Sequence, residues 1–179
     1  LESLVPVDAE SLDRARTVLG GLYAHTLNPT PAADVEARSR VVEGSVERLC
    51  LSPAAAGHAV PAALVSPDDG FTELVVLVSE SGKDALAADG TVEALVSAGY
   101  GVLAVDVFGV GEAAGRERDK GQHFLTFNRS DAAARVQDII TAAAYAATLA
   151  DTVHLVGVGG AGLWTLLARP LVGVSGKCV

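Results

Sequence analysis

The spacing of hydrophobic residues changes along the chain, and each change marks a different predicted element. Within 11–22 the apolar side chains recur at the three-to-four-residue spacing of an amphipathic helix: Leu12, Ala15, Val18, Leu19 and Leu22. Two prolines in the segment 28–33 end this helix and predict a linker. We therefore expect an N-terminal helical extension with its linker over residues 1–40 and a main domain over 41–179.

Strand patterns follow the linker. Residues 41–51 and 59–66 alternate well enough to predict two strands, which we expect to form an antiparallel hairpin through the region of Gly57. After a turn at 67–70, the run 74–78 is aliphatic throughout. Such a run is typical of a strand that is buried on both faces of a sheet.

From residue 74 onward, predicted strands and helices alternate regularly. The strands are 74–78, 101–106 and 153–156, and the helices are 84–98, 130–150 and 163–168. Gly99 is the expected C-cap of the first of these helices and Ser130 the expected N-cap of the second. A loop rich in glycine and charge is predicted over 108–128. This alternation predicts a three-layer α/β/α sandwich around a mostly parallel sheet.

Composition narrows the class of protein. Half of the 179 residues are hydrophobic, which suffices for one substantial core. The net charge of -9 and the lack of a basic cluster argue against a nucleic-acid partner, and no apolar run approaches the roughly 20 residues of a membrane-spanning helix. Cys50 and Cys178 have neither metal nor redox spacing, so we expect unpaired thiols. Nothing indicates a compartment. Because methionine is absent even at the start, we expect a processed or trimmed piece of a longer polypeptide.

The junction at 157–162, Gly-Val-Gly-Gly-Ala-Gly, is the most informative motif, because a sharp strand-to-helix turn requires very small residues. One interpretation is a nucleophile elbow, Gly-x-Ser-x-Gly, in which a serine stands exposed above the sheet. Aligning Gly157 with the first glycine places Gly159 at the serine position. Glycine carries no nucleophile.

A second interpretation is the dinucleotide fingerprint Gly-x-Gly-x-x-Gly, matched by Gly157, Gly159 and Gly162. That motif normally follows the first strand of its unit and needs an acidic residue about 20 positions later. The corresponding position here falls near Lys177. A third interpretation is a tight turn without any ligand, and the motif alone does not exclude it.

The wider sequence resembles the α/β-hydrolase superfamily, in particular its acetyl xylan esterase and dienelactone-hydrolase-like branch. The resemblance rests on LVSAGYGVLAVDVFGVGEA (95–113), FNRSDAAARVQDIITAAAYA (127–146) and VHLVGVGGAG (153–162), in this order. It covers roughly residues 40 to 170 and implies a truncated α/β-hydrolase-like fold, with a C-terminal part that we expect to be missing.

The resemblance also implies where an oxyanion hole would lie. The loop 79–82 would supply one backbone donor, from Ser81 or Gly82, and the N–H of Gly160 would supply the second. The acid and the histidine of a triad should follow the elbow, but no Asp, Glu or His follows Gly159. His25, His58, His123 and His154 lie elsewhere, and we assign them no catalytic role. The resemblance therefore implies an inactive or incomplete hydrolase.

These expectations leave a small set of ligands and partners. A small ester or carbohydrate is the ligand that the resemblance implies, and no cofactor or metal is expected. Association with a second copy, or with another domain of a longer polypeptide, is a further expectation. A domain that lacks its nucleophile would serve as a structural or binding partner in such an association.

Overall fold

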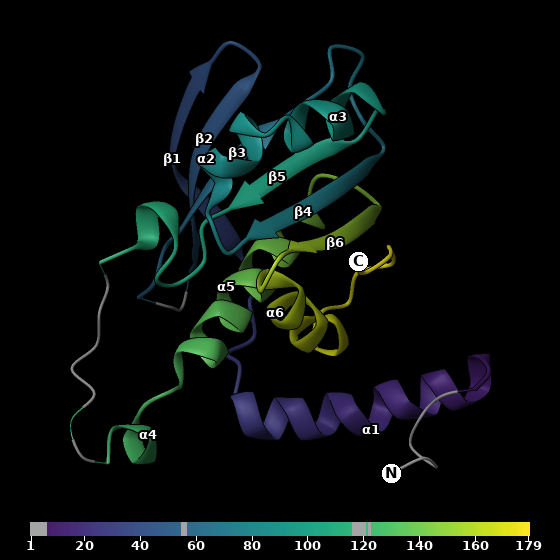
Figure 1. Ribbon diagram of the computed structural model, residues 1–179, viewed down its shortest axis with the longest axis vertical. Coiled ribbons are helices and arrows are strands. Elements are labelled where there is room, and N and C mark those ends of the chain that lie inside the picture. Colours follow the sequence, from purple (N-terminus) through teal and green to yellow (C-terminus); the bar gives the residue numbers. More distant parts are fainter. Residues whose placement is uncertain (1–6, 55–56, 116–120, 122) are drawn as a thin grey trace.

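The computed structural model describes residues 7–54, 57–115, 121 and 123–179 and shows an α/β protein built on one sheet (Figure 1). The strands are β1 (Val35–Glu43), β2 (Val46–Pro53), β3 (Val60–Val65), β4 (Glu73–Ser79), β5 (Gly101–Val105) and β6 (Thr152–Val158). They lie in the order β1-β2-β3-β5-β4-β6. β1, β2, β3 and β5 pair antiparallel in turn, whereas β4 is parallel to both β5 and β6.

Helices cover both faces of the parallel half of the sheet. They are α2 (Lys83–Ala88), α3 (Thr91–Ser97), α5 (Asp131–Ala146) and α6 (Ala161–Ala168). Successive side chains of β4 point to opposite faces: Val75 and Leu77 pack with α2 and α3, whereas Val76 and Val78 join the core under α5 and α6. This double burial explains the unbroken aliphatic run of β4 and confirms the predicted three-layer fold class.

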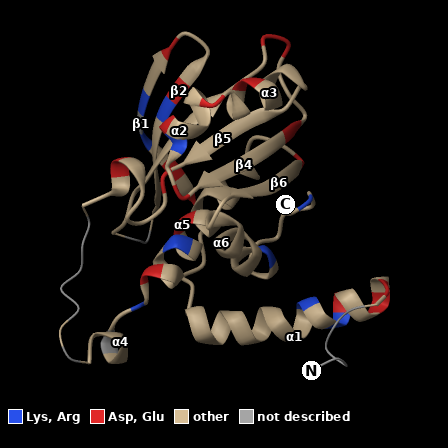
Figure 2. Ribbon diagram, viewed as in Figure 1, with Lys and Arg blue, Asp and Glu red and all other residues tan. Residues whose placement is uncertain are grey.

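The first helix, α1 (Ala9–Leu27), lies outside these layers (Figure 1). None of its residues is buried, and its charged side chains are confined to its N-terminal half (Figure 2). The linker behind it is held by Gln137 of α5, whose side-chain amide accepts from the N–H of Thr30 at 2.6 Å and donates to the carbonyl of Thr30 at 2.9 Å. Gln137 thus bonds the linker as a neighbouring strand would.

The last four residues extend the sheet beyond β6. Gly176 and Val179 donate backbone hydrogen bonds to Val153 and Leu155, and β6 donates in return to Lys177 and Val179. This segment, 176–179, runs parallel to β6. Cys178 within it and Cys50 in β2 are free thiols, as expected.

Several predicted boundaries were wrong. The single strand expected over 41–51 is two strands, β1 and β2, joined by a turn at Gly44, and β1 begins at Val35. The single helix expected over 84–98 is interrupted at Gly90, whose φ of 83° lies in the left-handed region, and so forms α2 and α3.

The later elements keep their predicted order with shifted ends. α5 ends at Ala146 and not at residue 150, although Ser130 is its N-cap as predicted. The loop expected over 108–128 contains two short helices, η2 (Gly111–Ala113) and α4 (Phe124–Phe127), while residues 116–120 and 122 of it lie outside the described residues. α6 is followed by η3 (Arg169–Leu171). Among the described helices, none combines the length and apolarity needed to cross a membrane.

Candidate functional site

Three junctions meet at one edge of the sheet. Because β4, β5 and β6 are parallel, the loops that follow them share the edge at their carboxyl ends, where open α/β sheets bind their ligands. The junctions begin at Glu80 after β4, at Asp106 after β5 and at Gly159 after β6.

The junction after β6 is a bare turn. Gly159 has a φ of +64°, a left-handed conformation that suits glycine, and Gly160 caps α6 with ordinary helical angles. Gly157 is needed for a different reason: a Cβ there would lie 2.7 Å from the carbonyl of Ala161 and would overlap the hydroxyl of Thr165. Glycine therefore permits both the sharp bend and the close approach of α6 to β6. Gly159 and Gly160 are exposed to solvent.

The carboxylate of Glu80 lies against this turn. A Cβ built on Gly159 would overlap Oε1 of Glu80, and one built on Gly160 would overlap Oε2. Glu80 is exposed, and no hydrogen bond or ion pair joins its carboxylate to the described residues. Sequence reasoning missed this residue, because nothing in a single glutamate after a strand signals contact with a turn 79 positions later.

The predicted backbone donors differ in how they are engaged. The N–H of Ser81 donates to Oγ of Ser79 at 3.1 Å, and the N–H of Gly82 donates to the carbonyl of Ser79 at 3.3 Å. The N–H of Gly160, in contrast, has no acceptor among the described residues. In this conformation the loop after β4 therefore directs its predicted donors inward, whereas the predicted donor in the turn after β6, the N–H of Gly160, stays available.

The junction after β5 is built around a buried ion pair. Asp106 and Lys83 have side chains only 1% and 2% exposed, with Nζ of Lys83 2.7 Å from Oδ2 of Asp106. Asp106 also accepts from the N–H of Lys83 at 2.8 Å and from the N–H of Glu112 at 2.9 Å. The carboxylate of Glu112 completes the cluster by accepting from Lys83. A carboxylate with this many donors holds its loop in place.

The carboxylates of this cluster stabilise the charge of Lys83, and the backbone packs closely around them. Burial by itself lowers the pKa of Lys83, but the hydrogen bonds and negative charges of Asp106 and Glu112 outweigh burial, so the pKa is raised above its ordinary value. Gly111, with a φ of +51°, has no room for a side chain because a Cβ would overlap the carboxyl group of Asp106. No sequence pattern pointed to Lys83, which lies 23 positions before its partner Asp106.

The histidines lie in other local networks. Nε2 of His58 lies 3.2 Å from the hydroxyl of Thr141 on α5. Nε2 of His154 lies 2.8 Å from Glu73, and its Nδ1 accepts from the N–H of Lys177 at 3.0 Å, a bond that ties the segment 176–179 to β6. His25 lies in α1, and His123 caps α4. Among the described residues, no cluster of His, Cys, Asp or Glu could hold a metal ion.

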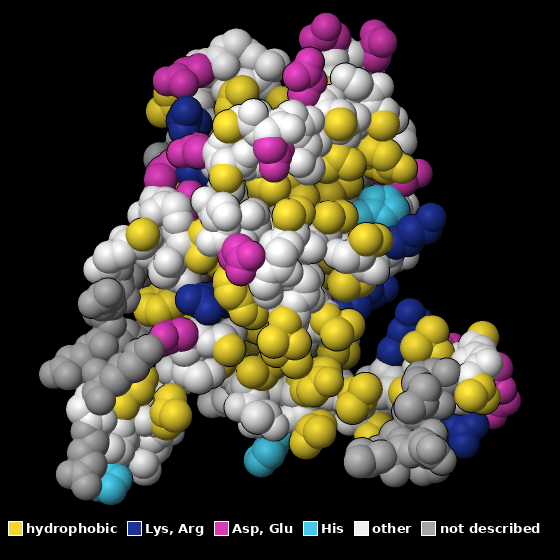
Figure 3. All heavy atoms as spheres, viewed as in Figure 1, with side chains coloured by type: hydrophobic (Ala, Val, Ile, Leu, Met, Phe, Trp, Pro, Cys, Tyr) yellow, Lys and Arg dark blue, Asp and Glu magenta, His cyan; other side chains and the backbone are white. Residues whose placement is uncertain are grey.

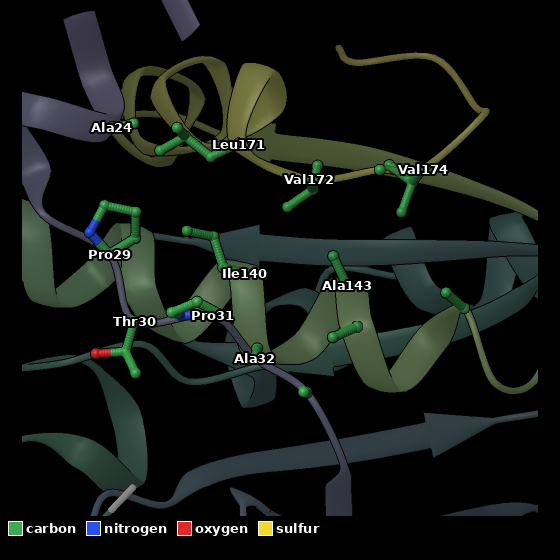
Figure 4. Close-up of a pocket in the computed structure, with 14 residues that line it drawn as sticks. Ala24, Pro29, Thr30, Pro31, Ala32, Ile140, Ala143, Leu171, Val172 and Val174 are labelled. Atoms are coloured by element: carbon green, nitrogen blue, oxygen red, sulfur yellow. The ribbon is translucent and has the colours of Figure 1, made fainter. Parts of the chain in front are cut away.

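A cavity of about 550 Å³ lies away from these junctions, between the linker, α5 and residues 171–174 (Figure 4). Its walls are mostly apolar, with Pro29, Ile140, Leu171 and Val172 among them. The hydroxyl of Thr30 is engaged with Arg129 at 2.8 Å. With so few polar groups, this cavity offers nothing for acid, base or nucleophilic chemistry.

Comparisons with known proteins bear on the fold. No family model and no curated protein sequence matches the chain. Among solved structures, a candidate acetyl xylan esterase from Bacteroides fragilis superposes with a TM-score of 0.72 over 90% of this chain and 51% of its own length, at 15% identity. The chain thus spans about half of that protein.

Two further structures agree. A dienelactone hydrolase from Anabaena variabilis has a TM-score of 0.52 at 18% identity, covering 74% of this chain and 62% of its own. An epoxide hydrolase from an endophytic Streptomyces has a TM-score of 0.50 at 21% identity, covering 73% of this chain and 35% of its own. All three are described as esterases or hydrolases, and they do not favour the dinucleotide interpretation. The chain has the α/β-hydrolase fold.

Proposed function

We propose that this chain is an esterase-like α/β-hydrolase domain, related to carbohydrate esterases, that binds a small ester or sugar at the β6–α6 turn without cleaving it. The observation that carries this proposal is the turn itself: Gly159 has the left-handed backbone and the exposed position of a nucleophile elbow, yet it has no hydroxyl. In an active domain that hydroxyl would attack the acyl carbon.

The rest of the site supports binding without turnover. The free N–H of Gly160 remains able to donate a hydrogen bond to the carbonyl oxygen of a ligand, because a backbone donor survives the loss of a neighbouring side chain. The donors of Ser81 and Gly82 would need to turn outward to join it. Such a domain would act as a binding or structural partner, for a second copy or for another domain of a longer polypeptide.

A nucleotide ligand at the same turn is disfavoured by charge. A dinucleotide would place its pyrophosphate at the N-terminus of α6, between Gly159 and Gly162. The carboxylate of Glu80 already lies there, and like charges repel. We therefore expect titration with NAD to produce no saturable signal.

A fluorophosphonate probe tests the absence of a working nucleophile. We expect no serine of the folded protein to be labelled, whereas a serine esterase included as a positive control is labelled fully. Labelling of any serine, with Ser79 and Ser81 the first to inspect, would contradict the proposal. Labelling is a better readout than esterase activity, because the oxyanion hole and substrate binding alone can accelerate hydrolysis about 10³- to 10⁴-fold over the reaction in water.

Amide NMR tests the binding half of the proposal. Titration with acetylated xylobiose, or with ethyl acetate as the smallest ester, should shift the amide resonances of Gly159 and Gly160. Gly44, in the distant β1–β2 turn, provides a matched glycine reference that should not move. Equal shifts at all three glycines, or none at the turn, would count against a ligand site there.

A further inference from the structure

The environment of Glu80 leaves its charge uncompensated. The cations of the neighbouring junction are committed elsewhere: Lys83 to Asp106 and Glu112, and Arg135 to the carbonyl of Phe108 at 3.0 Å and to the ring of Trp164 at 4.3 Å. The described residues supply no ion-pair partner for Glu80. A carboxylate without a partner among the described residues therefore lies beside the free N–H of Gly160.

Glu80 also occupies a specific volume. Its two carboxylate oxygens would overlap Cβ atoms built on residues 159 and 160, so Glu80 can hold this position only while both residues are glycine. In a nucleophile elbow this volume belongs to the serine side chain. Glu80 replaces a neutral hydroxyl on the turn with a negative charge that comes from the neighbouring loop.

We infer that Glu80 is a specificity-determining residue of this site: its carboxylate fills the nucleophile's volume and sets the site against anionic ligands and against the oxyanion of acyl transfer. The inference rests on the proposed function, because it takes the β6–α6 turn to be the ligand site. An oxyanion at the N–H of Gly160 would form a few ångströms from a like charge, which opposes the stabilisation that the amide provides. Neutral esters and sugars remain acceptable ligands, whereas acids and phosphates do not.

This inference predicts the reactivity of a thiol placed at the turn. A cysteine reacts through its thiolate, and a helix N-terminus ordinarily favours that thiolate. In Gly159→Cys the negative charge of Glu80 should disfavour formation of the thiolate. We expect Glu80→Gln to lower the pKa of the introduced thiol by about one unit, which raises its alkylation rate by iodoacetamide at pH 7 about tenfold. Site-resolved mass spectrometry provides the rates, with Cys50 and Cys178 as internal references.

Two comparisons separate charge from shape. Glutamine keeps the size of Glu80 but not its charge. A purely steric effect would therefore leave the alkylation rate unchanged in Glu80→Gln and would alter it only in Glu80→Ala. When Glu80 is neutralised, the alkylation rate with iodoacetate, which is anionic, should rise more than the rate with neutral iodoacetamide. Glu93→Gln, an exposed carboxylate on α3, removes the same net charge elsewhere and should leave both rates unchanged.

A second thiol position covers the case in which Gly159→Cys does not fold. Gly160 has an ordinary φ of -61° and faces the other oxygen of Glu80, so Gly160→Cys should show the same dependence on Glu80. Equal rates in the Glu80, Glu80→Gln and Glu80→Ala backgrounds would overturn the inference. That result would leave the fluorophosphonate experiment unaffected, so the two proposals fail independently.

Discussion

The junctions after β5 and β6 lie at the same edge of the sheet but are built in opposite ways. The β5 junction buries Lys83 and Asp106 together and bonds Asp106 to two backbone amides. The β6 junction is exposed glycine, and the carboxylate beside it has no partner among the described residues. The Lys83–Asp106 pair of the first junction is closed to solvent, whereas the glycines of the second are exposed. The ionisable cluster at the β5 junction thus fits a structural role, and the bare turn after β6 is the candidate site.

Substitution at Lys83 should produce the largest effect. Lys83→Met leaves the carboxylate of Asp106 buried without its cation, and breaking a buried pair in this way costs about 3 to 5 kcal/mol. Urea unfolding followed by circular dichroism provides the measurement. Lys177→Met, an exposed lysine, is the matched control and should stay within about 0.5 kcal/mol. If the two variants were equally stable, the β5 junction would not be the structural one.

An alanine at Gly159 should have an intermediate effect. Gly159→Ala forces an L-residue into a φ of +64°, which costs about 1 to 2 kcal/mol, while exposed Glu80 can swing aside. Gly162→Ala lies within α6, where a Cβ meets only the carbonyl of Gly157 at 3.6 Å, so it should stabilise by up to about 1 kcal/mol. The two substitutions are therefore expected to change the free energy of unfolding in opposite directions. The same sign in both would show that the turn does not hold Gly159 as described.

The response to alkaline pH should be the smallest effect. The pKa of Lys83 is raised in the folded protein, so the folded state holds this proton more tightly than the unfolded chain does. Its contribution is therefore complete below the unfolded pKa of about 10.4 and is lost as pH rises through the higher folded pKa. The stability difference between the unmodified protein and Lys83→Met should stay constant from pH 7 to 9 and shrink above about 10.5. A decline already at pH 8 would contradict the raised pKa.

The sequence predicted elements well where burial imposes a pattern. The β4 run at 74–78 and the order of strands and helices beyond it follow from double-sided burial. β1 was missed over 35–40 because it lies at the edge of the sheet, where alternating burial leaves no hydrophobic signature. The break at Gly90 was missed because apolar residues continue at helical spacing on both sides of it.

The residues of the candidate site also fall into those that the sequence could predict and those that it could not. The glycines at 157–162 were recognisable because one tight turn dictates several neighbouring residues. The partners of Asp106 lie 23 positions before it and six after it, and Glu80 reaches the turn from another strand. The contacts that Lys83 and Glu80 make depend on the register of parallel strands, which no local pattern encodes.

The segment 176–179 has a consequence for how the protein behaves among other chains. An open sheet presents unpaired backbone groups at each edge, and these are templates for aggregation. The segment 176–179 hydrogen-bonds the outer side of β6 and so pairs backbone groups that this strand would otherwise present. The opposite edge, β1, carries Glu36, Arg38, Arg40 and Glu43, and like charges from an incoming copy would oppose in-register stacking. Pairing with the segment 176–179 thus protects β6 from further strand addition, and electrostatic repulsion protects β1.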